Sequence, residues 1–147
     1  MTRVDFYILT ADESSRDRFA CALTGKALCQ GRQVYIHTGS RESALLLDDL
    51  LWTFRDISFI PHALADDKAG GNGPVCIGWD GDSPVSGDVL INLGTDIPAS
   101  AADFSRVMEI VVTDAASRQQ SRDRYRRYRE LGFELHSHEL ESDYAKL

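Results

Sequence analysis

Arginine is concentrated in one short stretch of this chain. Residues 118–129 read RQQSRDRYRRYR, with six arginines and one acidic residue, whereas the remainder of the chain is strongly acidic. A helix with 100° between residues places four side chains on one stripe and a fifth at its edge: Arg118, Arg122, Tyr125, Arg129 and, at the edge, Arg126. Guanidinium groups bind carboxylates through paired hydrogen bonds, and an aromatic ring can cover an apolar side chain. The stripe therefore suits an acidic, partly apolar ligand, with a solvated helix face as the plainer alternative.

The residues around this stretch predict where its helix begins and ends. Thr113 and Asp114 follow the apolar run 107–112 and are typical of a helix N-cap. Gly132 is typical of the glycine that ends a helix. On the side of the helix away from the arginine stripe, Tyr128 and Leu131 are expected to reach a core.

Nucleotide-binding motifs are missing where such a chain would carry them. The turn after the first predicted strand reads LTADESS and has no glycine fingerprint, which argues against a dinucleotide site. Gly25-Lys26 lies inside a predicted helix and lacks the other residues of a P-loop. The glycines at 70–73 precede a strand, so they cannot direct a helix N-terminus at a phosphate. We expect no nucleotide cofactor.

Histidines and paired acids are the other candidates for chemistry. His136 and His138 would share one face of a strand, but a metal site needs a third ligand and none is near in sequence. His62 has no nucleophile motif beside it and is expected to pack or to donate a hydrogen bond. The acidic pairs at 48–49 and 66–67 are interpreted as solvated surface, because adjacent acids point apart on a helix. We expect no metal and no catalytic residue.

Composition indicates one domain that covers residues 1–147. A net charge of −7 argues against general binding of nucleic acids or anionic membranes outside the basic stretch. No apolar run is long enough to cross a membrane, and the N-terminus lacks the apolar core of a signal peptide, so we expect a cytoplasmic protein. Cys21, Cys29 and Cys76 lack zinc spacing and are expected to be reduced thiols in or near the core.

The apolar pattern predicts an α/β fold. Strands are expected at 4–9, 34–37, 75–79, 89–93 and 107–112, with a last short strand at 133–135. Helices are expected from the caps at 12–15 to Gly31, from Arg41 to about Trp52, and in a short piece from Pro98 to Phe104. In the second helix the apolar side is expected to include Ala44, Leu45 and Leu47. This β-α-β-α beginning is typical of a mostly parallel sheet flanked by helices.

Large apolar side chains gather in and beside the segment 54–73, which is predicted to be irregular. They are Trp52, Phe59, Ile60 and Pro61. Exposed aromatic patches mark interfaces, whereas burial is the more common fate of tryptophan and phenylalanine. The pattern leaves open whether this cluster packs into the core or contacts a partner.

In the arginine-rich stretch and in the apolar cluster the sequence resembles the chi subunit family of bacterial DNA polymerase III. The matching segments are TRVDFYIL, DDLLWTFRDISFIPHALA, DVLINLGTDIP and RDRYRRYRELGFEL, so the likeness covers nearly the whole chain. The resemblance implies a single Rossmann-like α/β domain without a phosphate-binding loop. It also implies a non-catalytic accessory subunit of the replicative holoenzyme, without a cofactor.

Two protein-binding surfaces follow from the resemblance. The acidic, hydrophobic C-terminal tail of single-stranded DNA-binding protein (SSB) would bind to Arg118, Arg122, Tyr125, Arg126, Gly132 and Phe133. The psi subunit of the clamp loader would bind to Trp52, Phe59, Pro61 and His62, and an accessory helicase is expected to compete for that surface. The protein would thereby link the clamp loader to SSB without binding nucleic acid itself.

The expected tail site divides the work among its residues. Arg122 or a neighbouring basic residue would pair with the terminal carboxylate of the tail. Tyr125 and Phe133 would line a pocket for the apolar residue before it, while Arg118 and Arg126 would attract the aspartates further back.

Two other functions remain as alternatives to this one. A small nucleotide-binding or hydrolytic enzyme would use His62 with an acid at 66–67, and a nucleic-acid-binding protein would use the basic helix directly.

Overall fold

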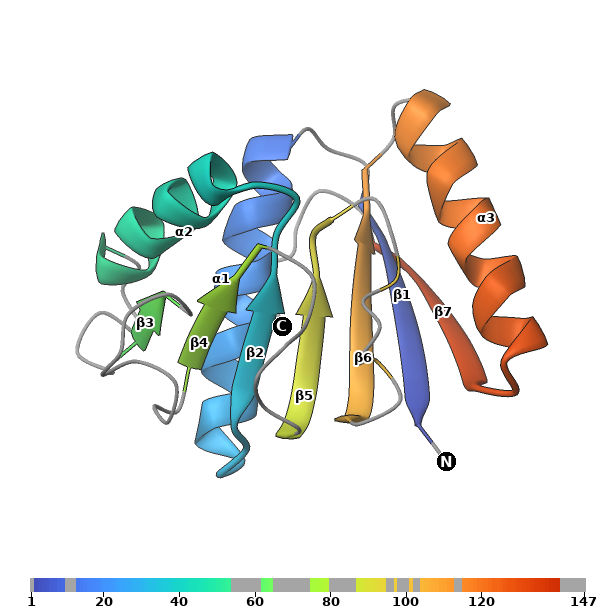
Figure 1. The fold of residues 1–147 in the computed structure, drawn as a ribbon, viewed down its shortest axis with the longest axis horizontal. Coiled ribbons are helices and arrows are strands. Elements are labelled where there is room, and N and C mark those ends of the chain that lie inside the picture. The colour runs from blue at the N-terminus through green and yellow to red at the C-terminus, as the bar shows by residue number, and fades with distance from the viewer. Residues whose placement is uncertain are drawn as a thin grey trace.

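The computed structural model describes residues 2–9, 13–53, 62–64, 75–79, 87–94, 97, 101, 104–112 and 115–140. Within these ranges the chain forms one seven-stranded sheet and three helices (Figure 1). The helices are α1 (Glu13–Cys29), α2 (Arg41–Thr53) and α3 (Ala115–Glu130). The strands are β1 (Arg3–Leu9), β2 (Val34–His37), β3 (His62–Leu64), β4 (Val75–Gly78), β5 (Gly87–Asn92), β6 (Phe104–Val111) and β7 (Glu134–Leu140).

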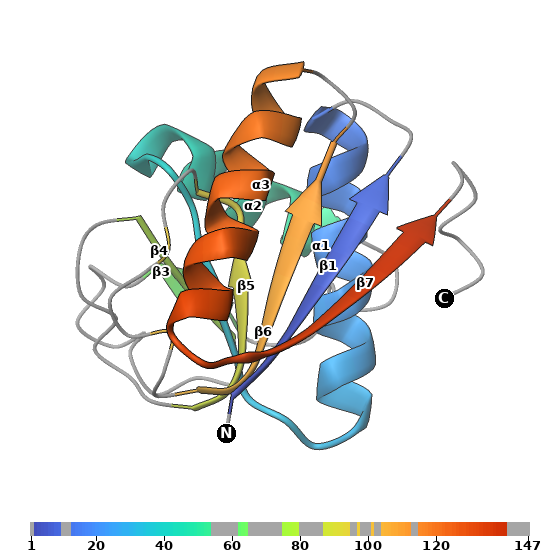
Figure 2. The same ribbon diagram turned by 90° about the vertical axis from the view of Figure 1, so that its right-hand side faces the viewer.

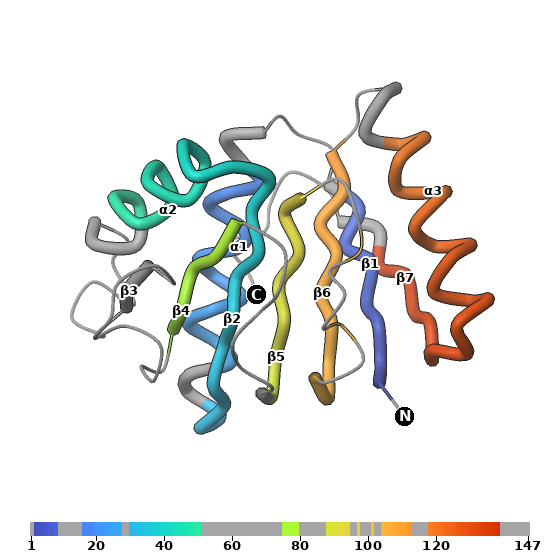
Figure 3. Tube along the Cα trace, in the orientation of Figure 1, coloured from blue at the N-terminus to red at the C-terminus, as the bar shows by residue number. Residues whose placement is uncertain are grey.

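The sheet confirms the predicted fold class. Its strand order is β3-β4-β2-β5-β6-β1-β7, and all six pairs of neighbouring strands are parallel. Figure 3 traces this arrangement along the Cα path, with β6 and β1 in the half of the sheet that α3 covers. Parallel strands require crossover connections, which is why helices cover both faces of the sheet.

Strand alternation divides the core into two layers. In β1, Val4 and Phe6 belong to the apolar cluster that also contains Tyr128 of α3, whereas Tyr7 belongs to the cluster that contains Phe19 of α1. Successive side chains of a strand point to opposite faces, so one strand supplies both layers. Figure 2 shows the result, with α3 on one side of β1 and β6 and α1 on the other.

Local signals placed the start of α2 and the end of α1 as predicted. Ser40 caps α2, since its Oγ accepts the backbone N–H of Ser43 at 3.1 Å. Gly31 follows α1 at φ 74°, a conformation that L-residues with a side chain rarely adopt.

Among the described residues, no helix is long and apolar enough to cross a membrane. Cys21 and Cys76 are buried free thiols as expected, and burial raises the pKa of Cys21 to about 12. The Cys29 side chain lies outside the described part.

Five details of the sequence prediction are wrong. Leu45 and Leu131 are 41% and 49% exposed, so neither reaches the core. Residues 62–64 form β3 inside the segment that was predicted to be irregular, and Phe104 opens a strand where a helix was expected to end. The last strand is also longer than the predicted 133–135. Strand pairing explains the three strand errors, because β3, the start of β6 and β7 are each held by pairing with a neighbouring strand, which a local pattern does not encode.

Candidate protein-binding surface on helix α3

A buried polar cluster holds α3 against the sheet. Glu109, in the middle of β6, is fully buried, and its Oε1 accepts a hydrogen bond from Arg124 Nε at 3.0 Å. Its Oε2 accepts the Tyr128 hydroxyl at 2.6 Å and the Asn92 side-chain amide at 2.8 Å. A buried carboxylate is tolerated only when it is paired and hydrogen-bonded, and these three donors meet that need. The cluster therefore fixes which side of α3 faces inward.

Electrostatics in this cluster follow from its burial. Burial raises the pKa of the Glu109 carboxyl, and the charge of Arg124 with the bonds from Tyr128 and Asn92 only partly opposes that rise. Burial and the adjacent carboxylate likewise raise the pKa of the Tyr128 phenol. Tyr128 therefore remains a hydrogen-bond donor throughout the physiological pH range. The sequence contained a signal for this cluster, a single acid inside the apolar run 107–112, that the prediction did not use.

Aromatic rings continue the contact from the core to the surface. Phe6 of β1 lies beneath α3, with its ring centroid 5.3 Å from Tyr125 and 6.0 Å from Tyr128. Phe133 is half-buried and lies 5.4 Å from the Tyr128 ring. Tyr125 remains 38% exposed, so one face of it is available to solvent. The ring contacts thus form a chain from Tyr125 through Phe6 and Tyr128 to Phe133, with Tyr125 and Phe133 at its two ends.

Gly132 positions Phe133 by ending α3 in a Schellman motif. The Phe133 N–H donates to the Tyr128 carbonyl at 3.1 Å, and the Gly132 N–H donates to the Arg129 carbonyl at 3.1 Å. Gly132 has φ 84°, which strongly favours glycine. The contact between Phe133 and Tyr128 is the apolar contact that usually accompanies this motif. The predicted helix end at Gly132 is therefore confirmed, while Thr113 and Asp114 lie outside the described residues.

The arginines of α3 separate into a buried one and an exposed set. Arg124 is 8% exposed and paired with Glu109. The exposed set comprises Arg118, Arg122, Arg126 and Arg129. Within the part of the chain that the structure describes, none of the four forms a salt bridge or a side-chain hydrogen bond. The acids of α3 are engaged elsewhere, Asp123 with Gln119 at 3.2 Å and Glu130 with Arg127 at 3.5 Å.

What this surface can do follows from its parts. Exposed guanidinium groups next to a half-exposed aromatic ring can bind a carboxylate and cover an apolar group at once. The helix is held rigidly beneath them by a buried ion pair and by packed rings. Five of the six residues predicted for the tail site lie on or directly after α3 with exposed or half-exposed side chains, and the sixth, Gly132, shapes the turn between them.

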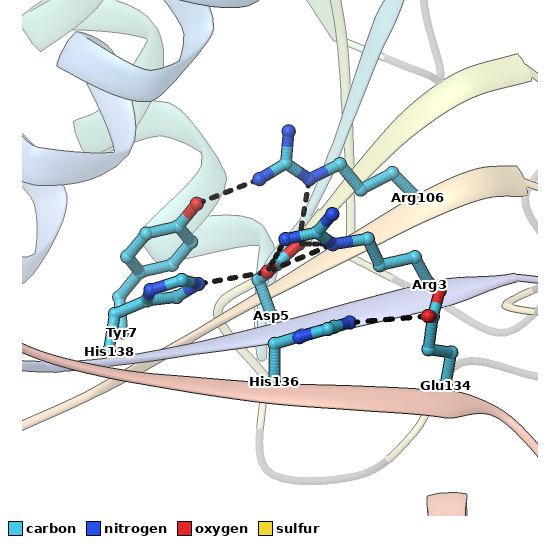
Figure 4. A network of polar contacts seen from close by, with 7 residues as sticks. All are labelled: Arg3, Asp5, Tyr7, Arg106, Glu134, His136 and His138. Carbon is cyan, nitrogen blue, oxygen red and sulfur yellow. Dashed lines mark hydrogen bonds and ion pairs between the residues drawn. The ribbon is translucent and has the colours of Figure 1, made fainter.

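A second polar network lies on the opposite face of the sheet (Figure 4). The fully buried Asp5 carboxylate contacts Arg3 Nη2 at 3.1 Å, Arg106 Nε at 2.7 Å and His138 Nε2 at 2.9 Å. Burial raises the pKa of Asp5, but the bonds from His138, Arg3 and Arg106 outweigh it and leave that pKa below its ordinary value. The prediction overlooked this network, although an acid in the apolar run VDFYIL marks it.

His136 and His138 share one face of β7, as predicted for a strand. They align with Asp5 and Tyr7 of β1, and the His138 ring stacks on Tyr7 at 5.0 Å. His136 Nε2 lies 3.5 Å from a carboxylate oxygen of Glu134. Within the described ranges, no three His, Cys, Asp or Glu side chains are grouped to hold a metal ion.

The predicted psi surface falls largely outside the described part. Phe59 and Pro61 are not described, nor are the acids at 66–67 that the enzyme alternative would need. Trp52 belongs to α2 and His62 to β3 by their backbones, without a described side chain. The two elements contact each other, so the backbones of these two residues come from adjoining parts of the fold. The surface itself stays a prediction.

Comparison with known proteins gives consistent matches over most of the chain. Residues 1–136 match the family described as DNA polymerase III chi subunit, HolC. A Pseudomonas aeruginosa protein named DNA polymerase III subunit chi is 46% identical over 142 residues, covering 95% of this chain and 98% of that protein. Proteins of the same name from Escherichia coli and Haemophilus influenzae are 32% and 33% identical, covering 93% and 88% of this chain and 97% and 92% of theirs.

Proposed function

The chain belongs to the DNA polymerase III chi subunit family, and we propose that it is a non-catalytic accessory subunit that links the clamp loader to SSB. It does so in the cytoplasm, with the psi subunit on one surface and the C-terminal tail of SSB on α3. The observation that carries the proposal is the exposed set of α3. Four arginines stand without an acidic partner among the described residues, beside a half-exposed tyrosine, in a chain of net charge −7.

The tail binds along the stripe with its C-terminus at the centre. Arg122 or a neighbouring arginine pairs with the terminal carboxylate, for which its planar fork is well suited. The apolar residue before that carboxylate packs on the aromatic cluster between Tyr125 and Phe133. Aspartates that precede this apolar residue in the tail are attracted to Arg118 and Arg126. Arg124 does not contact the tail, because Glu109 already neutralises it.

Binding of this kind is weak and sensitive to salt. Each hydrogen bond to a charged group contributes about 1.5–3 kcal/mol. Ordering a flexible tail and several long arginine side chains opposes this gain. The exposed position of the stripe also leaves it open to screening by ions.

The direct test is calorimetric titration of the protein with a peptide of the SSB C-terminal tail. Arg122→Ala should weaken binding by about tenfold or more, as expected for the loss of one charged hydrogen bond. The matched control is Arg127→Ala, which removes the same charge from the same helix but off the stripe, where Glu130 is the partner. Equal affinities of wild type and Arg122→Ala, or equal losses in both variants, would refute the assignment.

The psi surface has its own test. Trp52, Phe59, Pro61 and His62 form the expected contact, for which an accessory helicase competes. Phe59→Ala should release psi in a pull-down while leaving the melting temperature and tail-peptide binding unchanged. A large fall in melting temperature would mean that Phe59 is part of the core, and the proposed contact would then be wrong.

A further inference from the structure

A cavity of about 290 Å³ lies on the face of the sheet opposite to α3. It opens between the C-terminal half of α1 and the sheet, with lining residues from α1, β1, β5, β6 and β7 and from the turn after α1. Small-molecule sites usually occupy roughly 300–1,000 Å³, so this cavity has room for a small ligand only. Neither the SSB-tail surface nor the expected psi surface includes any of its residues.

The polar lining of the cavity is cationic. Lys26, Arg32 and Arg106 line it together with His138, and no acidic side chain is among the described residues that do so. Lys26 and Arg32 are exposed, and neither forms a salt bridge or a side-chain hydrogen bond with another described residue. Arg106 uses two of its five donors, Nε on Asp5 at 2.7 Å and Nη2 on the Tyr7 hydroxyl at 3.0 Å. Its remaining donors form no hydrogen bond with the residues that the structure describes.

The turn after α1 reduces the unfavourable effect of the helix C-terminus on a bound anion. A helix C-terminus carries partial negative charge on its free carbonyl groups. Here the Ala27 carbonyl accepts the backbone N–H groups of Gln30 at 3.1 Å and Arg32 at 3.0 Å. Ala27 itself lines the cavity. The carbonyl group of this lining residue is therefore satisfied internally, and the turn places Arg32 in the cavity lining as well.

The other walls of the cavity are apolar and aromatic. Leu23, Val89 and Met108 line it from α1, β5 and β6 and belong to the core cluster on that face. Tyr7 and His138 form a stacked pair with centroids 5.0 Å apart, and both line the cavity. Figure 4 shows this pair beside the Arg106 guanidinium. A site with cations on one part and apolar walls on another fits a ligand that has a negatively charged group and an apolar part.

The balance of charge selects the ligand class. Asp5 contacts Arg3, Arg106 and His138, so this carboxylate behind the cavity is already matched by more than one cation. Lys26 and Arg32 then add charge that no described acidic side chain in the lining offsets. A monoanionic carboxylate would leave part of this excess, whereas a phosphate monoester carries up to two negative charges and three acceptor oxygens. We propose that this cavity binds a small organic phosphate monoester, its phosphate held by Lys26, Arg32 and Arg106 and its apolar part against Met108 and Tyr7.

NMR titration of the backbone amides tests this with three probes: deoxyadenosine monophosphate, deoxyadenosine and inorganic phosphate. The monophosphate should shift the amides of Lys26, Gln30 and Arg32 in a saturable manner. Deoxyadenosine lacks the charge and inorganic phosphate lacks the apolar part, so each should bind at least about tenfold more weakly, a difference worth about 1.4 kcal/mol. Inorganic phosphate binding as tightly as the monophosphate would overturn the proposed ligand class.

Variants decide whether the cavity is the site. Lys26→Gln combined with Arg32→Gln should weaken monophosphate binding at least about tenfold, and Lys26→Gln alone should weaken it measurably. The control, Arg18→Gln combined with Arg41→Gln, removes two exposed charges that do not line the cavity and should bind as wild type does. Tail-peptide affinity and melting temperature should be unchanged in all variants. Unchanged binding in the double variant, or no saturable shift at about 10 mM monophosphate, would overturn the proposal.

Discussion

Arg124→Ala tests the buried cluster that orients α3. Removing one partner of a buried ion pair usually costs about 3–5 kcal/mol, because the remaining charge is left uncompensated. Glu109 keeps the hydrogen bonds from Tyr128 and Asn92 and can take up a proton, so we expect a loss near the lower end, about 3 kcal/mol at neutral pH. Arg127→Ala serves as control, since its pair with Glu130 is more than half exposed and contributes about 0–1 kcal/mol.

The loss should depend on pH in a defined direction. Burial already raises the pKa of Glu109 in the folded protein, and removing Arg124 removes the largest influence that lowers it. A group whose folded pKa is raised contributes its stability below the unfolded pKa, and that contribution is lost as pH rises through the folded pKa. The variant should therefore differ least from wild type in mild acid and most at neutral and alkaline pH.

Urea denaturation of wild type, Arg124→Ala and Arg127→Ala at several pH values measures these free energies of unfolding. Adding Glu109→Gln to Arg124→Ala removes the uncompensated charge, so the double variant should be more stable than Arg124→Ala at alkaline pH. The explanation fails if Arg124→Ala costs no more than Arg127→Ala, or if its cost is independent of pH. Tail-peptide binding should weaken in Arg124→Ala, because the inward side of α3 loses its anchor.

Three further outcomes are expected. Gly132→Ala places a Cβ at φ 84° and should lower stability by about 1 kcal/mol in thermal or urea unfolding and weaken tail-peptide binding, because Phe133 shifts; an unaffected variant would contradict the role of the turn. Asp5 has a lowered pKa, so its contribution is present above the unfolded value, near 3.8, and lost as pH falls below it; Asp5→Asn should flatten the acid limb of stability against pH, and an unchanged limb would exclude this. In gel-shift assays at physiological salt the protein should not slow the migration of single-stranded DNA, and a clear shift would favour direct binding by the basic helix.

Local sequence was sufficient for most elements and for the arginine stripe. Ser40, Gly31 and Gly132 act on the backbone within a few residues, so their caps and stops could be located without knowing the fold. The 100° rotation per residue likewise placed Arg118, Arg122 and Tyr125 on one stripe of α3, with Tyr128 outside it. These are properties of a single helix, and tertiary contacts do not change them.

The tertiary structure alone decided which charges are free to bind a partner. Arg124 is neutralised by Glu109, 15 residues away in sequence, and Asp5 is matched by Arg106 and His138, 101 and 133 residues away. The Asp5 pairs form because β1, β6 and β7 align side by side, and the Arg124 pair forms because α3 packs on β6; no local period encodes either arrangement. Pairing of this kind separates the four exposed arginines of α3 from the buried one, and it assembles the cationic cavity on the opposite face of the sheet.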